Sequence, residues 1–116
     1  ASGKLYLSSL PSDRRQRLIN KLSLTRYTRN TIVDAAALET ELQHIKTSRV
    51  GTDNEEFVDG MVAVSVPVND SNGKLCACLF THAPVIRKSF DQLLNYTEAL
   101  QSAAENLGHL IDDPEQ

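Results

Sequence analysis

The sequence predicts an α+β domain in which helices pack against a small antiparallel sheet. Three observations indicate this fold class. Residues 61–68 and 75–81 are apolar runs with the period of a β-strand, and the turn-rich residues 69–74 between them predict a hairpin. Residues 50–57 predict a third strand before the hairpin. Apolar residues with helical spacing occur on both sides of these strands.

The hairpin is expected to bury one of its faces. If Val68 pairs with Leu75 across the turn, every second residue of the first strand is a valine that points to one side. That face is predicted to be the core, against which the helices pack. Its valines are Val62, Val64, Val66 and Val68.

The opposite face of the hairpin mixes small, aromatic and polar side chains. The same register places Ala63 opposite Phe80 and Met61 opposite His82. Asp53 from the preceding strand is expected at the rim, with Ser65 and Cys78 nearby. Such a face either lines a pocket for a small molecule or fills a second core layer, and composition alone leaves both interpretations open.

Two helices are expected at the start of the chain. The first runs from Ser2 and ends before Pro11. The second is expected to be capped by Ser12 and to turn its basic residues toward solvent. Its buried apolar side is expected to be formed by Leu18, Ile19 and Leu22. The basic residues, which are more typical of a solvated face than of a phosphate site, are Arg14, Arg15, Arg17 and Lys21.

Two further helices flank the predicted sheet. Asp34 is expected to cap a helix with Leu38, Leu42 and Ile45 on its buried side. After Pro84 one long helix is predicted, with a capping box of Ser89 and Gln92. Its expected buried stripe is Phe90, Leu93, Leu94, Thr97, Leu100, Ala104, Leu107 and Ile111. The acidic tail at 112–116 is expected to fray.

Length and charge limit the possible functions. The 116 residues suffice for one domain, and a net charge of −3 argues against direct phosphate binding to nucleic acid. No apolar run approaches the roughly 20 residues that span a bilayer, so no membrane association is expected. Cys76 and Cys78 are expected to be reduced core thiols of a cytoplasmic protein. The chain starts without Met at Ala1, as if it were cut from a longer protein with additional strands.

Two further kinds of site could be built from the residue types present. Cys78, His82 and Asp53 have the residue types of a cysteine hydrolase, and Cys76, Cys78 and His82 those of a metal site. In a strand, Cys78 and His82 lie about 13 Å apart, which is too far for a nucleophile and its base or for one metal ion. No phosphate loop or other catalytic motif is present. The chain is therefore predicted to be neither an enzyme nor a carrier of a cofactor or metal.

Several short motifs in order resemble the effector-binding domain of IclR-type bacterial transcriptional regulators. Each is weak alone, but together they extend over nearly the whole chain. The matching residues are Ala1-Ser2-Gly3-Lys4 with Leu7, residues 27–32, Asp53-Asn54-Glu55-Glu56 with Gly60, and Pro67-Val68 with Asp70 and Gly73.

The resemblance implies a GAF-like domain that binds a small effector and alters the DNA affinity of a homodimer or homotetramer. Residues 1–116 would be the C-terminal part of that domain. The winged helix-turn-helix domain that contacts operator DNA and the first effector-domain strands would be absent from this chain. A small-molecule sensor without a regulatory role is the alternative.

The resemblance also assigns the effector-binding positions. In the family these are backbone amides before the Gly-Lys pair, an acidic residue, a cysteine and two serines. They correspond here to Ala1, Ser2, Asp53, Ala63, Phe80 and His82. Because three small polar groups are replaced, a tiny acid such as glyoxylate is disfavoured. A larger organic acid, such as a sugar acid or an aromatic acid, is expected instead, with His82 at its carboxylate and Phe80 against its body.

Overall fold

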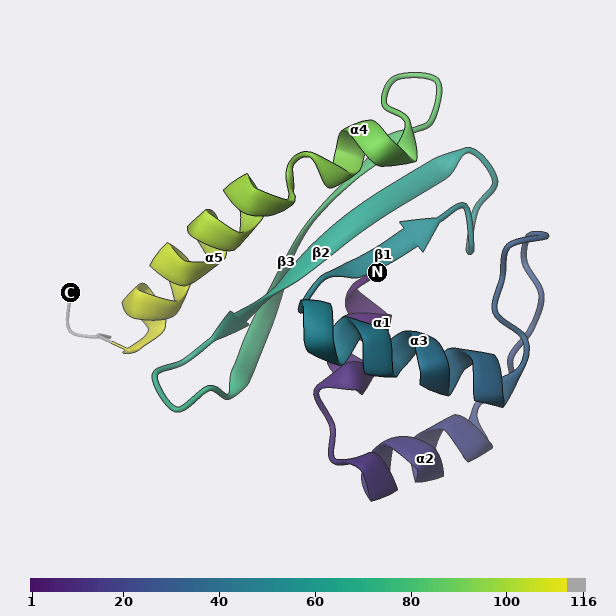
Figure 1. Cartoon of the computed structure of the whole chain (residues 1–116), viewed down its shortest axis with the longest axis horizontal. Helices are drawn as coiled ribbons and strands as arrows, with labels where there is room; N and C mark the ends of the chain where they lie inside the picture. Colours follow the sequence, from purple (N-terminus) through teal and green to yellow (C-terminus); the bar gives the residue numbers. More distant parts are fainter. Residues whose placement is uncertain (113–116) are drawn as a thin grey trace.

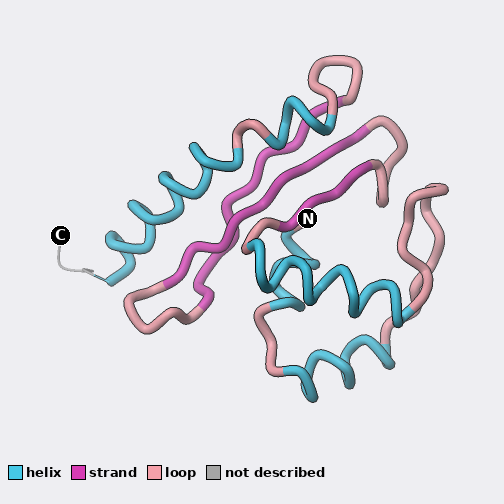
Figure 2. The backbone as a smooth tube through the Cα atoms, in the orientation of Figure 1, coloured by secondary structure: helices cyan, strands magenta, loops and turns pink. Residues whose placement is uncertain are grey.

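The computed structural model describes residues 1–112, so the tail at 113–116 lies outside the described residues. A three-stranded antiparallel sheet in the order β1-β2-β3 forms the centre of the described part (Figures 1 and 2). This arrangement confirms the predicted α+β class. The elements in chain order are α1 (Ser2–Ser8), α2 (Ser12–Lys21), α3 (Ala35–Ser48), β1 (Gly51–Asn54), β2 (Met61–Asn69), β3 (Leu75–Pro84), α4 (Phe90–Leu94) and α5 (Thr97–Asp112).

Helices cover both faces of the sheet. The helices α4 and α5 follow one face, whereas α1 lies against the other face and carries α3 and α2 behind it (Figure 1). The sequence predicted helices only on the valine face, and this was wrong for the N-terminal half. The face opposite the valines is therefore partly enclosed by α1, and this enclosure turns it into a pocket.

The valine face is core, as predicted. Its four valines are at most 2% exposed and pack against apolar residues of α4 and α5. Burial of each such side chain stabilises the fold by roughly 1.5–3 kcal/mol. The helix residues in contact with them include Leu93, Leu100 and Ala104.

The strand register differs from the predicted one by two residues. Val68 lies opposite Ala77 rather than Leu75, because the ladder is irregular between Val68 and Asn69. The turn is closed by Asp70, whose Oδ1 accepts hydrogen bonds from the N–H groups of Asn72 and Lys74 at 2.9 Å each. Since side chains alternate with a period of two, the even shift leaves every residue on its predicted face.

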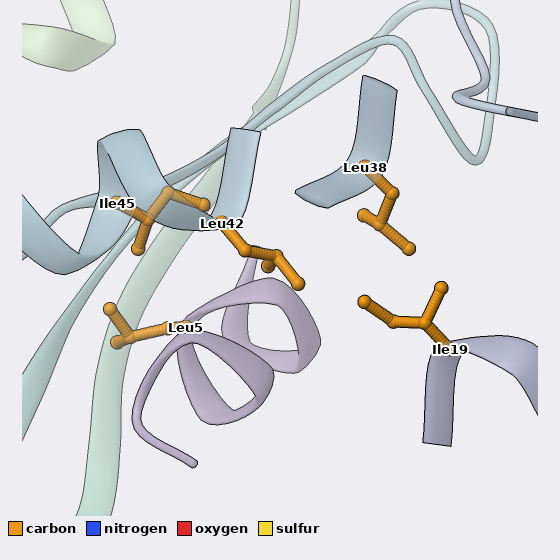
Figure 3. Packing of buried hydrophobic residues seen from close by; sticks show 5 residues of the cluster. All are labelled: Leu5, Ile19, Leu38, Leu42 and Ile45. Carbon is orange, nitrogen blue, oxygen red and sulfur yellow. The ribbon is translucent and has the colours of Figure 1, made fainter. Parts of the chain in front are cut away.

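A second core lies between the N-terminal helices. It consists of buried residues from α1, α2 and α3, namely Leu5, Ile19, Leu38, Leu42 and Ile45 (Figure 3). The predicted stripe of α3 and its cap are confirmed, because the Asp34 side chain accepts a hydrogen bond from the Ala37 N–H at 3.1 Å. This core fixes α1 above the sheet.

Helix α2 departs from its predicted pattern. Pro11, not Ser12, occupies the N-cap position, and no side chain caps the helix. Arg15 was expected in solvent but is fully buried, whereas Leu22 of the expected stripe is 47% exposed. Arg15 tolerates burial because its guanidinium is paired with Glu39 of α3.

The C-terminal helical region is two helices rather than one. The capping box of Ser89 and Gln92 is present as predicted. However, α4 ends at Leu94 and α5 begins at Thr97, because the two residues between them, Asn95 and Tyr96, have low helix propensity. Leu107 and Ile111, expected on the buried stripe, are 41% and 44% exposed. The predicted strand at 50–57 is also shorter, since β1 ends at Asn54 and a turn follows.

Candidate functional site

A cavity of about 430 Å³ lies between the start of α1, the turn after β1, and strands β2 and β3. It opens on the sheet face opposite the valines. All the residues that the sequence assigned to effector binding line it: Ala1, Ser2, Asp53, Ala63, Phe80 and His82. Four elements that are distant in sequence thus contribute to a single hollow.

Three of these residues form one row across the sheet. Ala63 of β2 pairs with Asp53 of β1 on one side and with His82 of β3 on the other. Paired Cα atoms lie about 4.5–5.5 Å apart, so an acid and an imidazole flank a single methyl group. Ala63 is too small to fill the space between its neighbours, and this is a direct cause of the hollow.

The register correction changes which residues face each other here. The sequence placed Phe80 opposite Ala63 and His82 opposite Met61. In the structure Phe80 pairs with Ser65 and His82 with Ala63. His82 therefore lies beside Ala63 rather than beside Met61.

Phe80 and His82 form an aromatic wall on β3. Their ring centroids are 5.7 Å apart with planes inclined by 35°. Phe80 lies on the edge strand and remains 52% exposed. Two adjacent rings at the mouth of a cavity provide a surface on which a planar or sugar-like ligand can stack.

Asp53 is the acidic residue among the described residues that line the cavity. Asp53 Oδ1 accepts a hydrogen bond from the Glu56 N–H at 2.8 Å, so this carboxylate also shapes the turn after β1. The Glu56 carboxylate is paired with Lys4 Nζ at 2.9 Å. A ligand is therefore expected to present hydrogen-bond donors to Asp53 and to place any negative charge at the other end.

The turn at 55–60 brings two apolar side chains to the cavity that the sequence analysis did not assign to it. Phe57 and Val58 line the cavity although they are 61% and 49% exposed. The turn is held by the Glu55 carboxylate, which accepts from the Gly60 N–H at 2.9 Å. The sequence feature that could have predicted this role is the pair of consecutive bulky apolar residues between polar turn residues. Gly3, at the start of α1, was also missed as a lining residue.

The loop at 27–32 supports this turn from outside. The hydroxyls of Thr28 and Thr31 donate to backbone carbonyls of the turn, at Glu55 and Glu56. Tyr27 packs against Phe57 with ring centroids 4.9 Å apart. Two sequence motifs that are far apart in the chain thus cooperate to position one wall of the cavity.

Ser65 was expected near the pocket residues on the mixed face. It is fully buried and is not part of the cavity lining. Its Oγ lies 3.3 Å from Ser2 Oγ, so the two hydroxyls join β2 to α1. Ser65 positions the start of the helix that forms one side of the cavity.

The cysteines do not form a catalytic or metal centre in the structure. Burial raises the pKa of the Cys78 thiol above its usual value, which disfavours the thiolate that a nucleophile requires. Cys76 is exposed, so its predicted place in the core was wrong. Within residues 1–112 no group of three His, Cys, Asp or Glu side chains is arranged to hold a metal ion.

None of the helices described between residues 1 and 112 is both long and apolar enough to cross a membrane. The fold and the cavity together define a class of protein: a small α+β domain with a cavity between a helix and one face of the sheet. Comparison with known proteins gives the family. Residues 1–109 match the family model described as the bacterial transcriptional regulator IclR C-terminal domain.

The relatives agree with the family model. The chain is 40% identical over 107 residues to the probable transcriptional regulator SauR of Cupriavidus necator, covering 92% of this chain and 42% of that protein. It is 31% identical over 107 residues to the HTH-type transcriptional regulator KdgR of Escherichia coli, covering 92% and 41%. The chain thus spans about two fifths of the length of these relatives.

Solved structures show the same fold. The C-terminal domain of E. coli KdgR superposes with a TM-score of 0.86 at 29% identity, covering 97% of this chain and 68% of that one. The inducer-binding domain of a PobR double mutant from Acinetobacter, in complex with 3-hydroxybenzoic acid, superposes with a TM-score of 0.87 at 28% identity, covering 92% and 62%.

The chain belongs to the IclR family of bacterial transcriptional regulators and is similar to its C-terminal domains. The predicted GAF-like class is confirmed by these structural neighbours. Because the family and the relatives are regulators and not enzymes, the hydrolase alternative was wrong.

Proposed function

We propose that residues 1–116 are the C-terminal part of an effector-binding domain whose cavity takes a small organic acid and thereby alters the DNA affinity of a regulator. The observation that carries this proposal is the row Asp53, Ala63 and His82 beside the ring of Phe80, all lining one cavity. A cavity of about 430 Å³ falls within the range typical of small-molecule sites.

The arrangement of polar groups favours a hydroxylated acid. Asp53 accepts hydrogen bonds and repels anions, so it suits a ligand hydroxyl. His82, about two strand spacings away, suits the carboxylate, and N–H groups at the start of α1 have no intrahelical acceptor and can assist. Phe80 offers a stacking surface between them. Sugar acids and hydroxybenzoic acids both combine these groups, and the PobR domain noted above holds such an acid.

Regulation follows from differential binding. An effector that binds one quaternary arrangement more tightly shifts the DNA-competent population by that difference in binding free energy. Operator DNA would be bound by another domain of the regulator, since this chain carries a net charge of −3. We expect the regulator to act in the cytoplasm as a homodimer or homotetramer, as the family resemblance implies.

A thermal-shift screen of matched acids tests the proposal. We expect 3-hydroxybenzoate or a sugar acid such as gluconate to raise the unfolding temperature, because ligand at 100 times its Kd adds about 2.7 kcal/mol to stability. Benzoate lacks the hydroxyl and 3-hydroxybenzyl alcohol lacks the carboxylate, so both should bind more weakly than 3-hydroxybenzoate. If none of the hydroxy acids raises the unfolding temperature, the residues form an occluded second core layer instead of a ligand site.

The replacement His82→Ala tests the role of the imidazole. We expect at least tenfold weaker binding of the acid found in the screen, because a charge-assisted hydrogen bond to the carboxylate is lost. His44→Ala is the matched control, since His44 is exposed on α3 and lines neither this cavity nor its neighbours. Equal affinity of the two variants would remove His82 from the site. If the regulator binds its operator DNA with the same affinity in the presence and absence of the acid, the domain is a sensor without a regulatory role.

A further inference from the structure

A second cavity, of about 550 Å³, lies at the other end of α1 and β2. Its walls come from the C-terminal half of α1, the start of α2, the end of α3 and the turn between β2 and β3. It shares no lining residue with the effector cavity. It is therefore a separate site to which neither the sequence analysis nor the proposed function assigns a role.

Four basic residues line this cavity, which we call the basic cleft: Arg14, Lys46, Arg49 and Lys74. Within residues 1–112 no aspartate or glutamate belongs to this lining. Among the described residues none of the four side chains has a carboxylate partner, whereas Lys4, Arg15 and Arg17 each have one. Four exposed cations without a carboxylate partner thus surround one concave surface of a chain with a net charge of −3.

The fold itself explains only two of these cations. Lys46 lies in the last turn of α3 and Arg49 is its C-cap, where positive charge is favourable without any ligand. Arg14 lies in the first turn of α2, where the helix dipole disfavours a cation. Lys74 lies in the exposed turn between the strands. Local electrostatics therefore does not account for Arg14 and Lys74.

The start of α2 adds a second, independent feature. Its N-cap is Pro11, which lines the basic cleft, and no side chain caps the first N–H groups of this ten-residue helix. An uncapped helix N-terminus beside unpaired cations favours an anion, and phosphate oxygens are well suited to both kinds of donor. Tyr6, Leu10 and Leu75 give the same cleft an apolar side.

We propose that the basic cleft binds a small organic molecule carrying phosphate groups. The phosphates lie among the four cations and the start of α2, and the organic part contacts the apolar side. The volume suits one small ligand.

The test is an NMR titration of the ¹⁵N-labelled full chain with inorganic pyrophosphate at constant ionic strength. We expect saturable amide shifts confined to residues 6–14, 46–51 and 69–75, with the effector cavity unaffected. The double variant Arg14→Gln/Lys74→Gln should weaken pyrophosphate binding at least tenfold. The matched control Arg17→Gln/Lys21→Gln removes the same charge from exposed positions of α2 outside the cleft and should leave binding unchanged.

Other outcomes overturn the proposal. Amide shifts at all exposed basic residues would mean that pyrophosphate is attracted nonspecifically by positive charge. Equally weakened pyrophosphate binding in the control variant would mean the same. Tighter binding of a DNA duplex than of pyrophosphate, competing for the same amides, would make the cleft a DNA contact instead. If the double variant does not fold, Lys74→Gln alone, in an exposed turn, should still weaken binding about threefold, and unchanged affinity would refute the site. None of these results bears on effector binding.

Discussion

Arg15 is the residue whose replacement tests the packing of the N-terminal helices most directly. Its side chain is fully buried between α2 and α3. The guanidinium donates to the Glu39 carboxylate, with Nη2 2.6 Å from Oε1, and Nη1 donates to the Leu10 carbonyl at 3.3 Å. A buried charge that loses its partner is strongly destabilising, and so is a carboxylate left without its cation.

We expect Arg15→Met to lower the free energy of unfolding by about 2 kcal/mol. The change removes the buried charge itself, so the loss is that of its charge-assisted hydrogen bonds, which contribute roughly 1.5–3 kcal/mol, and the remaining Glu39 side chain is 26% exposed and can be rehydrated. Urea unfolding measures this difference. Arg17→Met is the matched control: Arg17 is 72% exposed and 3.9 Å from its acid, so a change within about 0.5 kcal/mol is expected.

The double variant Arg15→Met/Glu39→Leu sharpens the test, because replacing both partners by apolar residues leaves no unpaired charge. It should recover most of the lost stability. If Arg15→Met is as mild as the Arg17 control, the buried pair does not hold α2 against α3 in solution, and the reasoning fails.

The same pair predicts a pH dependence. The hydrogen bond from Arg15 lowers the pKa of Glu39 below its usual value of 4.5. A carboxylate with a lowered folded-state pKa contributes stability above its unfolded-state pKa and loses it as the pH falls through the folded-state value. The stability gap between the natural chain and Arg15→Met should therefore be largest near neutral pH and shrink below about pH 4.5. A gap that widens on acidification would contradict this.

Two further predictions concern packing and reactivity. Gly108→Ala should lower the unfolding free energy despite the higher helix propensity of alanine, because a Cβ at this position would lie 2.5 Å from the Asn69 carbonyl oxygen. Gly3→Ala, also in a helix but with open space around it, should be neutral or stabilising in the same urea experiment, and the reverse order would refute the close approach. Iodoacetamide should label exposed Cys76 several times faster than Cys78, whose raised pKa reduces its thiolate, as peptide mass spectrometry would show; equal rates would contradict the burial of Cys78.

Local pattern was enough to predict the sheet and its two faces. Alternating valines specify a buried face whatever the exact register, because side chains on a strand repeat every second residue. For this reason an error of two residues in the pairing left Ala63, Phe80 and His82 on one face, and the predicted pocket residues meet in one cavity. The cap at Asp34 was predictable for the same reason, since capping depends on a few adjacent residues.

The sequence by itself determined the α+β class, the valine core and the placement of Ala63, Phe80 and His82 on one face of the sheet, because each depends on short-range periodicity. Only the tertiary structure decided that Arg15 is buried, that Ser65 joins β2 to α1, and that threonines of the loop at 27–32 hold the turn after β1. These features are contacts between residues 24 to 63 positions apart in the chain. Such contacts exist only once the helices have packed on the sheet, and no local pattern encodes them.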